Sequence, residues 1–443
     1  MMKKINYLFA TIAAVGLVAC SSEEVASVQD LQQGLKTSES IAFSPLSKNS
    51  TRSTIINSTS DITSFKVRGT WKDAQTTGDK IYINGKEITL ATNIAAGAEY
   101  VGQVKETSTG SGVYTFDADK GFGTGIEIVN NSGAWNYKNT DQTQYWPFTA
   151  IIDNTTNPAK TTGYTCLPLD FKAVTPASLT FDLSATTFDY TVPALVNMTD
   201  ICYAVADNKT NKDAPVEMKF NHIFSQIVVK AKKADGYDVE IREVVIGGVM
   251  GEGRLDLTQL VAPTYDETTK KSSGTQWGSL NKVGDGTYTA YTSATAYTVP
   301  ASAADASPIQ ITPSGQELLL LPQDIKAWDP NQEVLSSATA PNIGYIMIKY
   351  RAKKSTEAWP DANFKTTYYP LSATWYAGKI YSYTLLFGGA TDPDKIDDPE
   401  NPDPGSDNPG GYDENGKPNP PSVPITFTAS VTNWEPETVD IKF

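Results

Sequence analysis

Short apolar or alternating runs recur along the whole chain, and none of them continues into a helical pattern. They are rich in β-branched and aromatic residues, and Gly, Asn, Asp or Pro lies between them. The clearest runs are residues 81–83, 114–116, 126–129, 179–181, 227–229, 244–246 and 345–348. Asn84-Gly85, which follows the first run, predicts a hairpin turn. Many short strands with frequent turns predict an all-β protein built from β-sandwiches.

Polar stretches divide this pattern into regions. Residues 21–37 are polar and predict a flexible tether, and the polar run 207–213 predicts a joint between two globular parts, 38–210 and 211–390. Residues 391–424 contain nine prolines, with acidic residues concentrated at the front. Because proline removes backbone donors and like charges repel, this stretch is predicted to be an extended and unpacked linker.

The last part of the chain, residues 425–443, begins with a strict period-two pattern, which predicts a strand with one face to bury. Its apolar positions alternate with Thr or Ser and are Ile425, Phe427, Ala429 and Val431. Such a strand must add to a sheet, either on its own domain or on a neighbouring copy, because alone it cannot satisfy its backbone. Since the predicted linker cannot hold it, we expect a loosely docked strand, and a chain cut after Ala390 should keep both domains folded.

The first twenty residues have the layout of a bacterial lipoprotein signal peptide. Lys3 and Lys4 precede an apolar stretch over residues 5–18, which is too short for a good membrane span. This stretch ends in a lipobox, Leu17-Val18-Ala19-Cys20, whose thiol takes the lipid. We therefore predict a signal peptide over residues 1–20 and lipidation at Cys20; the alternative is an ordinary signal peptide with a chance cysteine.

The chain of 443 residues is acidic, with a formal net charge of −14. This charge argues against nucleic acid and anionic lipid headgroups as partners of the folded protein. After Cys20 only Cys166 and Cys202 remain. They can form a disulfide, since export permits it, or stay as two buried thiols, and the sequence leaves both possibilities open.

No segment predicts a catalytic residue, a cofactor or a metal site. His222 is the single histidine, and no Ser, Cys or metal-ligand constellation accompanies it by spacing, so a structural role near the domain joint is favoured. The carboxylate pairs Glu23-Glu24 and Asp397-Asp398 lie in segments without a core and are interpreted as solvated charge. The Gly-rich residues 247–253 precede no helix pattern, which favours a turn or bulge over a phosphate loop. The scattered Tyr and Trp residues are assigned to the core.

Several motifs give the chain a family resemblance when they are taken in order and spacing. They are the lipobox, then residues 41–44 (IAFS), 51–53 (TRS), 133–137 (GAWNY), 145–147 (YWP), 220–227 (FNHIFSQI), 318–323 (LLLLPQ) and 375–383 (WYAGKIYSY). With these motifs the chain resembles the fimbrillin family, the type V pilins of Bacteroidales, over nearly its whole length. The resemblance implies two tandem transthyretin-like β-sandwich domains, export as a lipoprotein, trimming by an arginine-specific protease, and polymerisation by strand exchange.

Arg52 is the residue to which the resemblance gives a role. It lies in a Ser/Thr/Asn-rich segment between Phe43 and the next strand-like run, 62–67, and such a segment should be an exposed loop that a protease can reach. Lys48 and Arg68 are the alternative processing sites, and Arg68 is less favoured because it lies inside the strand pattern. The remaining interpretation is a surface arginine without a role.

The resemblance implies a structural subunit of a cell-surface pilus that supports adhesion and is not an enzyme. Cutting after Arg52 would release residues 21–52 with the lipid and the strand around Phe43, and the strand at 425–434 of another copy could fill the open groove. The expected partners are other copies or related pilins, the maturation protease, the outer membrane through the lipid before processing, and host or bacterial surface ligands. Two alternatives stay open: a lipid-retained anchor pilin, and a glycan-binding outer-membrane lipoprotein of a polysaccharide uptake system.

Overall fold

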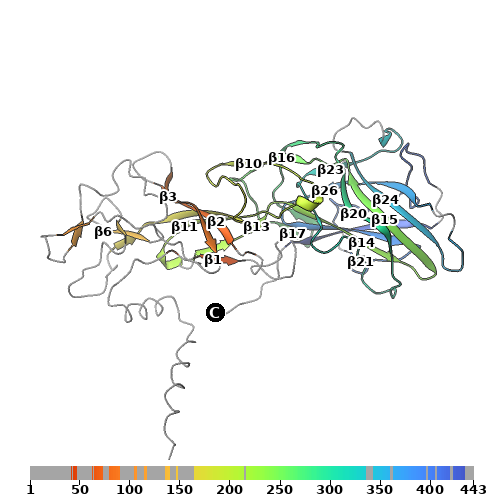
Figure 1. Cartoon of the computed structure of the whole chain (residues 1–443), viewed down its shortest axis with the longest axis horizontal. Coiled ribbons are helices and arrows are strands. Elements are labelled where there is room, and N and C mark those ends of the chain that lie inside the picture. Colours follow the sequence, from red (N-terminus) through yellow and green to blue (C-terminus); the bar gives the residue numbers. More distant parts are fainter. Residues whose placement is uncertain are drawn as a thin grey trace, which may run out of the picture.

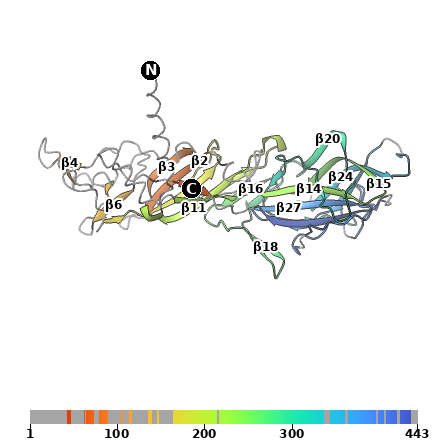
Figure 2. The same ribbon diagram turned by 90° about the horizontal axis from the view of Figure 1, so that it is seen from below.

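In the computed structural model the regular secondary structure of the described residues is almost entirely β-strand, which confirms the predicted all-β class. The described residues are 41, 43–46, 62, 64–72, 79–89, 104–106, 114–116, 135–139, 146–147, 164–213, 216–335, 343–359, 363–395, 398–404, 407–419 and 423–434. Their strands fall into two groups along the long axis of the molecule (Figure 1; Figure 2), and β13 lies between them in Figure 1. Among these residues, no helix is long and apolar enough to cross a membrane.

The first group is centred on a five-stranded sheet with the order β13-β11-β9-β2-β3. Its strands are β13 (Asn221–His222), β11 (Cys202–Lys209), β9 (Leu169–Thr175), β2 (Ser64–Lys72) and β3 (Asp79–Thr89). Smaller sheets accompany it: β1 (Phe43–Leu46) with β12 (Val216–Lys219); β4 (Val104–Glu106) with β5 (Tyr114–Phe116); and β6 (Asn136–Asn139) with β7 (Trp146–Pro147) and β8 (Tyr164–Cys166).

Aromatic side chains fill the centre of the first group. Phe43 of β1 meets Phe65 and Phe171 edge to face, with ring centroids 6.0 and 5.3 Å apart, and Trp135 packs on Phe171 in the same way. Together with buried residues of β2, β3, β9, β11 and β12 they form one hydrophobic cluster, called here the first core. The first core therefore depends on β1, a strand that lies far from β12 in sequence and pairs with it in parallel.

The second group contains two large sheets. The first has the order β21-β14-β27-β28, with β22 also paired to β14. Its strands are β21 (Ile309–Gln310), β14 (Ser225–Lys233), β27 (Lys379–Phe387), β28 (Ile425–Asn433) and β22 (Leu318–Leu320). The second sheet joins β20 (Tyr288–Thr298), β15 (Tyr237–Gly247), β24 (Ile343–Lys354), β23 (Asp324–Ala327), β26 (Ala373–Thr374) and β25 (Lys365–Pro370).

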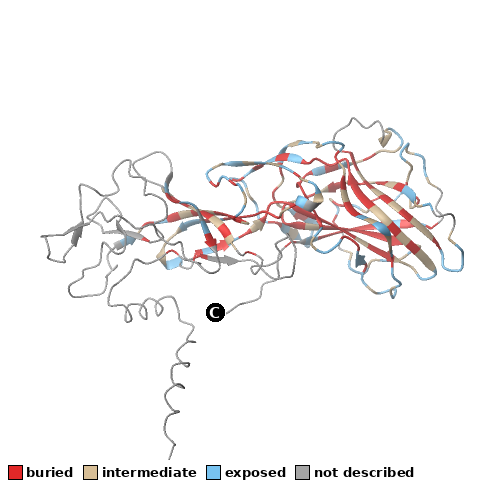
Figure 3. Cartoon of the chain, in the orientation of Figure 1, coloured by how far each residue is buried: buried red, intermediate tan, exposed pale blue. Residues whose placement is uncertain are grey.

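The inner faces of these two sheets make a single hydrophobic cluster, called here the second core (Figure 3). Ile227 and Val229 of β14 and Leu385 of β27 contribute from one sheet, and Ile241 of β15 and Ile348 of β24 contribute from the other. Two sheets that share one apolar layer form a sandwich. Several large aromatic side chains lie in this core, as predicted, and Trp375, Tyr369, Tyr381 and Tyr383 are all fully buried.

A third sheet links the two predicted globular parts. It has the order β10-β16-β19, with β10 (Thr187–Thr191), β16 (Glu252–Asp256) and β19 (Gly278–Asn281). The remaining described elements are the strands β17 (Thr264–Asp266) and β18 (Lys271–Ser273) and the short 3₁₀-helices η3 (Leu195–Asn197) and η4 (Asn211–Asp213). Phe181 and Leu183 belong to the second core although they precede residue 210. The boundary at 210/211 and the tandem transthyretin-like arrangement stay predictions.

Two local predictions are wrong. The run 179–181 is not a strand but lies in the irregular segment between β9 and β10, and the run 126–129 lies outside the described residues. Asn84-Gly85 is not a hairpin turn but lies inside β3, where the pairing with β2 shifts between Gly69 and Val67. Gly85 has φ +61°, a left-handed conformation that glycine adopts without strain and that suits a bulge. The Gly-rich segment 247–253 behaves as predicted, because it connects β15 to β16 through a bend at Gly248.

Candidate functional site

Cys20 and Arg52, which are predicted to act in export and maturation, lie outside the described residues. The same holds for Lys48, Glu23-Glu24, Asp397 and the tether over residues 21–37. Arg68 is described and lies half-buried in β2, inside a strand as its pattern predicts. The candidate site that the structure does describe is the terminal strand β28, the linker before it and the joint between the two cores.

β28 is an edge strand of its own domain. All nine of its residues pair with β27 in antiparallel register, from Lys379 opposite Asn433 to Phe387 opposite Ile425. The alternating apolar residues predicted from the sequence are all buried in the second core, and Phe427 packs against Tyr369 with ring centroids 4.5 Å apart. The sequence had left open whether the strand folds back or completes a neighbour, and in this chain it folds back.

The prediction of an extended, unpacked linker is wrong for its described part. Side-chain oxygens of Asp392, Asp398, Asn408 and Asp413 each accept a hydrogen bond from the backbone N–H two residues later, which folds the chain into successive Asx turns. Other backbone groups of the linker bond within the linker, as the Asn419 N–H does to the Gly411 carbonyl, and others bond to the domain. The linker backbone pairs with β25, for example, through two hydrogen bonds of 2.9 Å between Tyr412 and Tyr368.

The expectation of solvated charge also fails at Asp398, which is 4% exposed. Its Oδ2 accepts a hydrogen bond of 3.0 Å from Ser272 Oγ on β18, and its Oδ1 accepts one from the Glu400 N–H. The neighbouring Asn401 is also buried and its amide donates to the Thr374 carbonyl. Acidic residues of this segment therefore attach the linker to the second domain instead of repelling it into solvent.

The linker also covers the edge of β28 that faces away from β27. The Ala429 N–H donates to Asp403 Oδ1 at 3.0 Å, and the Ile425 N–H donates to the Pro409 carbonyl at 2.9 Å. Thr428 Oγ1 donates to Asp392 Oδ2 at 2.8 Å. An uncovered edge strand presents unpaired backbone groups to other chains. Here these bonds close part of that edge.

We expect Asp403→Ala to loosen β28. The substitution removes the acceptor of the Ala429 N–H and the partner of Lys395, whose Nζ lies 2.7 Å from Asp403 Oδ2. The free energy of unfolding, measured by urea titration, should fall by about 1–2 kcal/mol. Asp407→Ala is the matched control, because Asp407 is an exposed acid of the same linker and its loss should cost less than about 0.5 kcal/mol. Equal effects of the two substitutions would show that Asp403 does not hold the strand.

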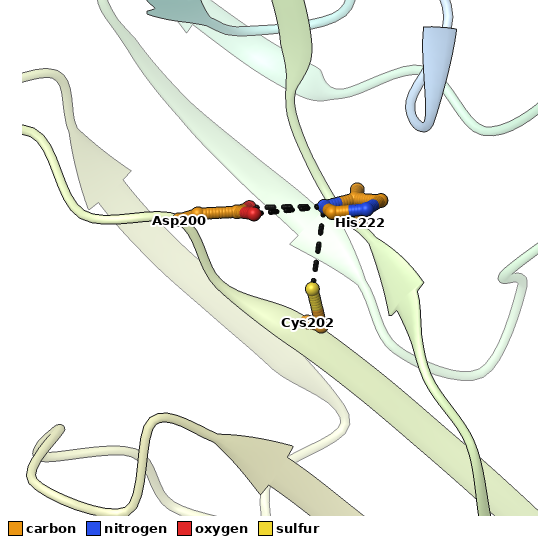
Figure 4. Close-up of side chains that lie close together, drawn as sticks. All are labelled: Asp200, Cys202 and His222. Atoms are coloured by element: carbon orange, nitrogen blue, oxygen red, sulfur yellow. Dashed lines mark hydrogen bonds and ion pairs between the residues drawn. The ribbon is translucent and has the colours of Figure 1, made fainter. Parts of the chain in front are cut away.

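The joint between the cores contains a buried cluster of three polar side chains (Figure 4). Cys202 and His222 are cross-strand neighbours of β11 and β13, and Asp200 lies two residues before Cys202. His222 Nδ1 lies 2.9 Å from Asp200 Oδ2, 3.2 Å from Asp200 Oδ1 and 3.3 Å from Cys202 Sγ. Cys202 belongs to the first core, whereas Ile201 and Ile223 beside the cluster belong to the second.

The end of β28 reaches this cluster. Trp434, the residue after the strand, stacks on the His222 ring with centroids 3.7 Å apart and planes within 8°. Its N–H donates to the Gly378 carbonyl at 2.8 Å, which fixes the chain at this point. The terminal strand therefore touches both the second core, along its length, and the domain joint, at its end.

The cluster is not arranged for nucleophilic catalysis. A catalytic base orients through one ring nitrogen and takes the proton of the nucleophile with the other, but here the carboxylate and the thiol both face Nδ1. Burial, with a further contribution from the Asp200 charge, raises the pKa of the Cys202 thiol well above its usual range, so the nucleophilic thiolate is disfavoured. The open question about the two cysteines is also answered, since Cys166 and Cys202 do not form a disulfide.

The sequence predicted a hydrogen-bonded structural role for His222 near the joint, and the structure has it there. The sequence did not predict the partners of this residue. Asp200 and Cys202 lie about twenty residues earlier, a spacing that matches no metal or catalytic motif. The usable signal was the strand pattern itself: two antiparallel strands bring residues of any separation face to face. Without the register, that signal does not select Cys202.

Comparison with known proteins completes the description. A family model described as fimbrillin-like matches residues 100–397, and no curated protein matches the chain. Similar solved structures include a fimbrial protein of Bacteroides vulgatus (12% identity, TM-score 0.35, covering 65% of this chain and 87% of that one). Another is a protein assigned to cell adhesion in Bacteroides uniformis (10% identity, TM-score 0.35, covering 89% of this chain and 99% of that one). A third is a protein assigned to cell adhesion in Parabacteroides distasonis (9% identity, TM-score 0.33, covering 91% of this chain and 98% of that one). The family match spans 298 of the 443 residues, and the chain belongs to the fimbrillin-like family.

Proposed function

We propose that the protein is a structural subunit of a cell-surface pilus, exported as a lipoprotein, trimmed after Arg52 and polymerised by exchange of its terminal strand. As a member of the fimbrillin-like family it is a structural protein and not an enzyme. The observation that carries the exchange is a repeated pattern. Residues 41–44 read Ile-Ala-Phe-Ser and residues 425–428 read Ile-Thr-Phe-Thr, so two segments at opposite ends of the chain present the same apolar pair.

The first copy of this pattern fills a place in the first core. Ile41 and Phe43 are fully buried, and Phe43 contacts the rings of Phe65 and Phe171. Burying one Ile and one Phe contributes roughly 3–6 kcal/mol. A cut after Arg52 would free this segment to leave, and an apolar groove floored by aromatic rings would remain. Such a groove needs a strand with apolar residues at alternate positions.

The second copy supplies such a strand. Ile425 and Phe427 have the same spacing as Ile41 and Phe43, so they suit the same floor. The free energy that β28 loses on leaving β27 is similar in kind to the free energy that it gains on entering the vacated groove, because both places bury the same side chains. Exchange is therefore unfavourable while residues 41–46 occupy the groove and becomes possible when trimming empties it. In this proposal, maturation at Arg52 controls assembly.

The mature N-terminus tests this proposal directly. We expect sequencing of the surface protein to begin at Ser53, and we expect Arg52→Ala to accumulate as untrimmed monomer with the first strand in place. The readout is N-terminal sequencing combined with a polymer ladder on a mild detergent gel. Lys48→Ala is the matched control, because it removes a neighbouring cation from the same segment and should leave trimming unchanged.

Other results would redirect the assignment. Polymers of normal length from Arg52→Ala, with a mature N-terminus elsewhere, would make Arg52 an ordinary surface residue. A lipidated Cys20 on the surface protein would instead support the anchor pilin or the glycan-binding lipoprotein. Binding of soluble glycans to the purified chain separates these last two.

A further inference from the structure

The buried cluster at the domain joint unites three different metal-ligating groups. Asp200, Cys202 and His222 are 0%, 1% and 8% exposed, and one ligand atom from each lies within 4.8 Å of the others (Figure 4). The pairing of β11 with β13 holds Cys202 opposite His222. Asp200 lies two residues before Cys202, in the segment that leads into β11. The sheet therefore positions two of the three side chains, and the third is close to them in sequence.

One nitrogen of the imidazole faces two neighbours at once. A ring nitrogen carries either one proton or one lone pair. If Nδ1 is protonated, its single proton is divided between the Asp200 carboxylate and the Cys202 sulfur, which is a weak acceptor; if it is not protonated, it can accept from the thiol but cannot donate to the carboxylate. Yet both partners lie within 3.3 Å of this one atom. Three lone-pair donors that converge in this way suit a cation between them better than a shared proton.

We propose that Asp200, Cys202 and His222 bind one zinc ion. Zinc prefers Cys sulfur, His nitrogen and carboxylate oxygen, and ligand bonds of about 2.0–2.3 Å at tetrahedral angles separate donor atoms by about 3.3–3.6 Å. The Nδ1–Sγ distance of 3.3 Å and the Nδ1–Oδ1 distance of 3.2 Å are close to this range. The Nδ1–Oδ2 distance of 2.9 Å is shorter, so this oxygen would have to move slightly outward to admit the ion. Calcium and magnesium prefer oxygen ligands and fit this donor set less well.

Charge balance favours the same ion. Without the ion the buried Cys202 is a thiol, and zinc binding would release its proton. The bound carboxylate and thiolate then carry two negative charges and a neutral imidazole adds none, so a divalent cation makes the buried site neutral. Both oxygens of Asp200 face Nδ1, which gives the carboxylate the option of two bonds to the ion. Four donor atoms are then present without a ligand from solvent.

Zinc at this place would brace the joint. It would connect β11, which contributes Cys202 to the first core, to β13 and the second core beyond it. Because Trp434 stacks on the ring of the proposed ligand His222, the ion would also stiffen the end of the terminal strand. Metal binding to the folded state alone raises its stability by mass action.

Zinc binding can be measured on the wild-type chain without any substitution. We expect the full chain, stripped with a chelator and dialysed, to bind one zinc per molecule by elemental analysis. Its Tm should rise by ~5 °C or more when zinc is at a hundred times its dissociation constant, and magnesium should not raise it. Cobalt(II) should give the near-ultraviolet charge-transfer band of a thiolate ligand.

Variants identify the ligands. Cys202→Ser and Asp200→Asn should each lose most of the zinc-dependent rise in Tm, and Cys202→Ser should lose the cobalt band. Cys166→Ser is the matched control, because it removes the other thiol of the described chain and should keep both signals. Absence of zinc from the re-equilibrated wild-type chain would overturn the proposal, as would an unchanged cobalt band in Cys202→Ser. The wild-type measurements remain decisive if a variant does not fold.

Discussion

A chain that ends after Ala390 is expected to lose the fold of its second domain. The cut removes the whole of β28, including Ile425, Phe427 and Val431, whose side chains are buried in the second core. These three side chains contribute roughly 5–9 kcal/mol, which is comparable with the total stability of a typical domain. Circular dichroism and a thermal melt should show a strongly lowered Tm or no cooperative transition.

A chain that ends at Trp434 is the control for this cut, because it keeps β28 and its stack on His222. We expect its melting curve to match that of the full chain. An unchanged Tm after the cut at Ala390 would restore the sequence-based expectation of a loosely docked strand. It would also mean that the nine-residue pairing with β27 adds nothing to the stability of the subunit.

Locking β28 onto its own domain is expected to abolish polymerisation of the trimmed protein. Ser382 on β27 and Ser430 on β28 face each other in the register, and both are buried. Cysteines at directly opposed positions of antiparallel strands can meet the distance that a disulfide needs. The double substitution Ser382→Cys and Ser430→Cys should therefore give monomers under oxidising conditions and polymers after reduction, as observed by electron microscopy.

Each single substitution serves as the control for the lock, because neither can form the bridge and both should polymerise like the wild-type chain. Mass spectrometry of the unreduced double variant establishes that the bridge has formed. Polymers of normal length from the bridged protein would mean that β28 stays on its own subunit during assembly. The first core would then have to be completed by a different segment.

These two experiments separate stability from assembly. The cut after Ala390 asks whether β28 is part of its own domain, and the lock asks whether it must leave that domain. Exchange of a strand that stabilises its own subunit requires that the second site gain at least the free energy that the second domain loses when β28 leaves. The shared Ile-x-Phe pattern of residues 41–43 and 425–427 is the physical basis for expecting such a site.

The sequence by itself determined the class of structure and the buried face of each strand. Side chains in a strand point alternately to opposite sides, so Ile425, Phe427, Ala429 and Val431 had to share a face whatever sheet received them. The burial of all four confirms this. The placing of His222 in a structural role followed from residue types alone, since no nucleophile or base stood near it in sequence.

Tertiary structure decided which partners these elements have. Period-two alternation specifies a face but not a neighbouring strand, so it could not choose between β27 of the same chain and the sheet of another copy. It also could not show that Cys202 and Asp200 meet His222, because strand register brings together residues that no local spacing connects.

Tertiary structure also decided the conformation of the linker. Its prolines and acidic residues predict an unpacked chain when only local repulsion and missing donors are counted. In the folded protein, Asp398 accepts hydrogen bonds from Ser272 and Glu400. Asp403 accepts hydrogen bonds from Ala429 and Lys395. Repulsion between neighbouring carboxylates acts in the unfolded chain as well as in the folded one. Hydrogen-bond donors such as Ser272 and Ala429 come within reach only after the domain has folded, and these donors decide where the linker lies.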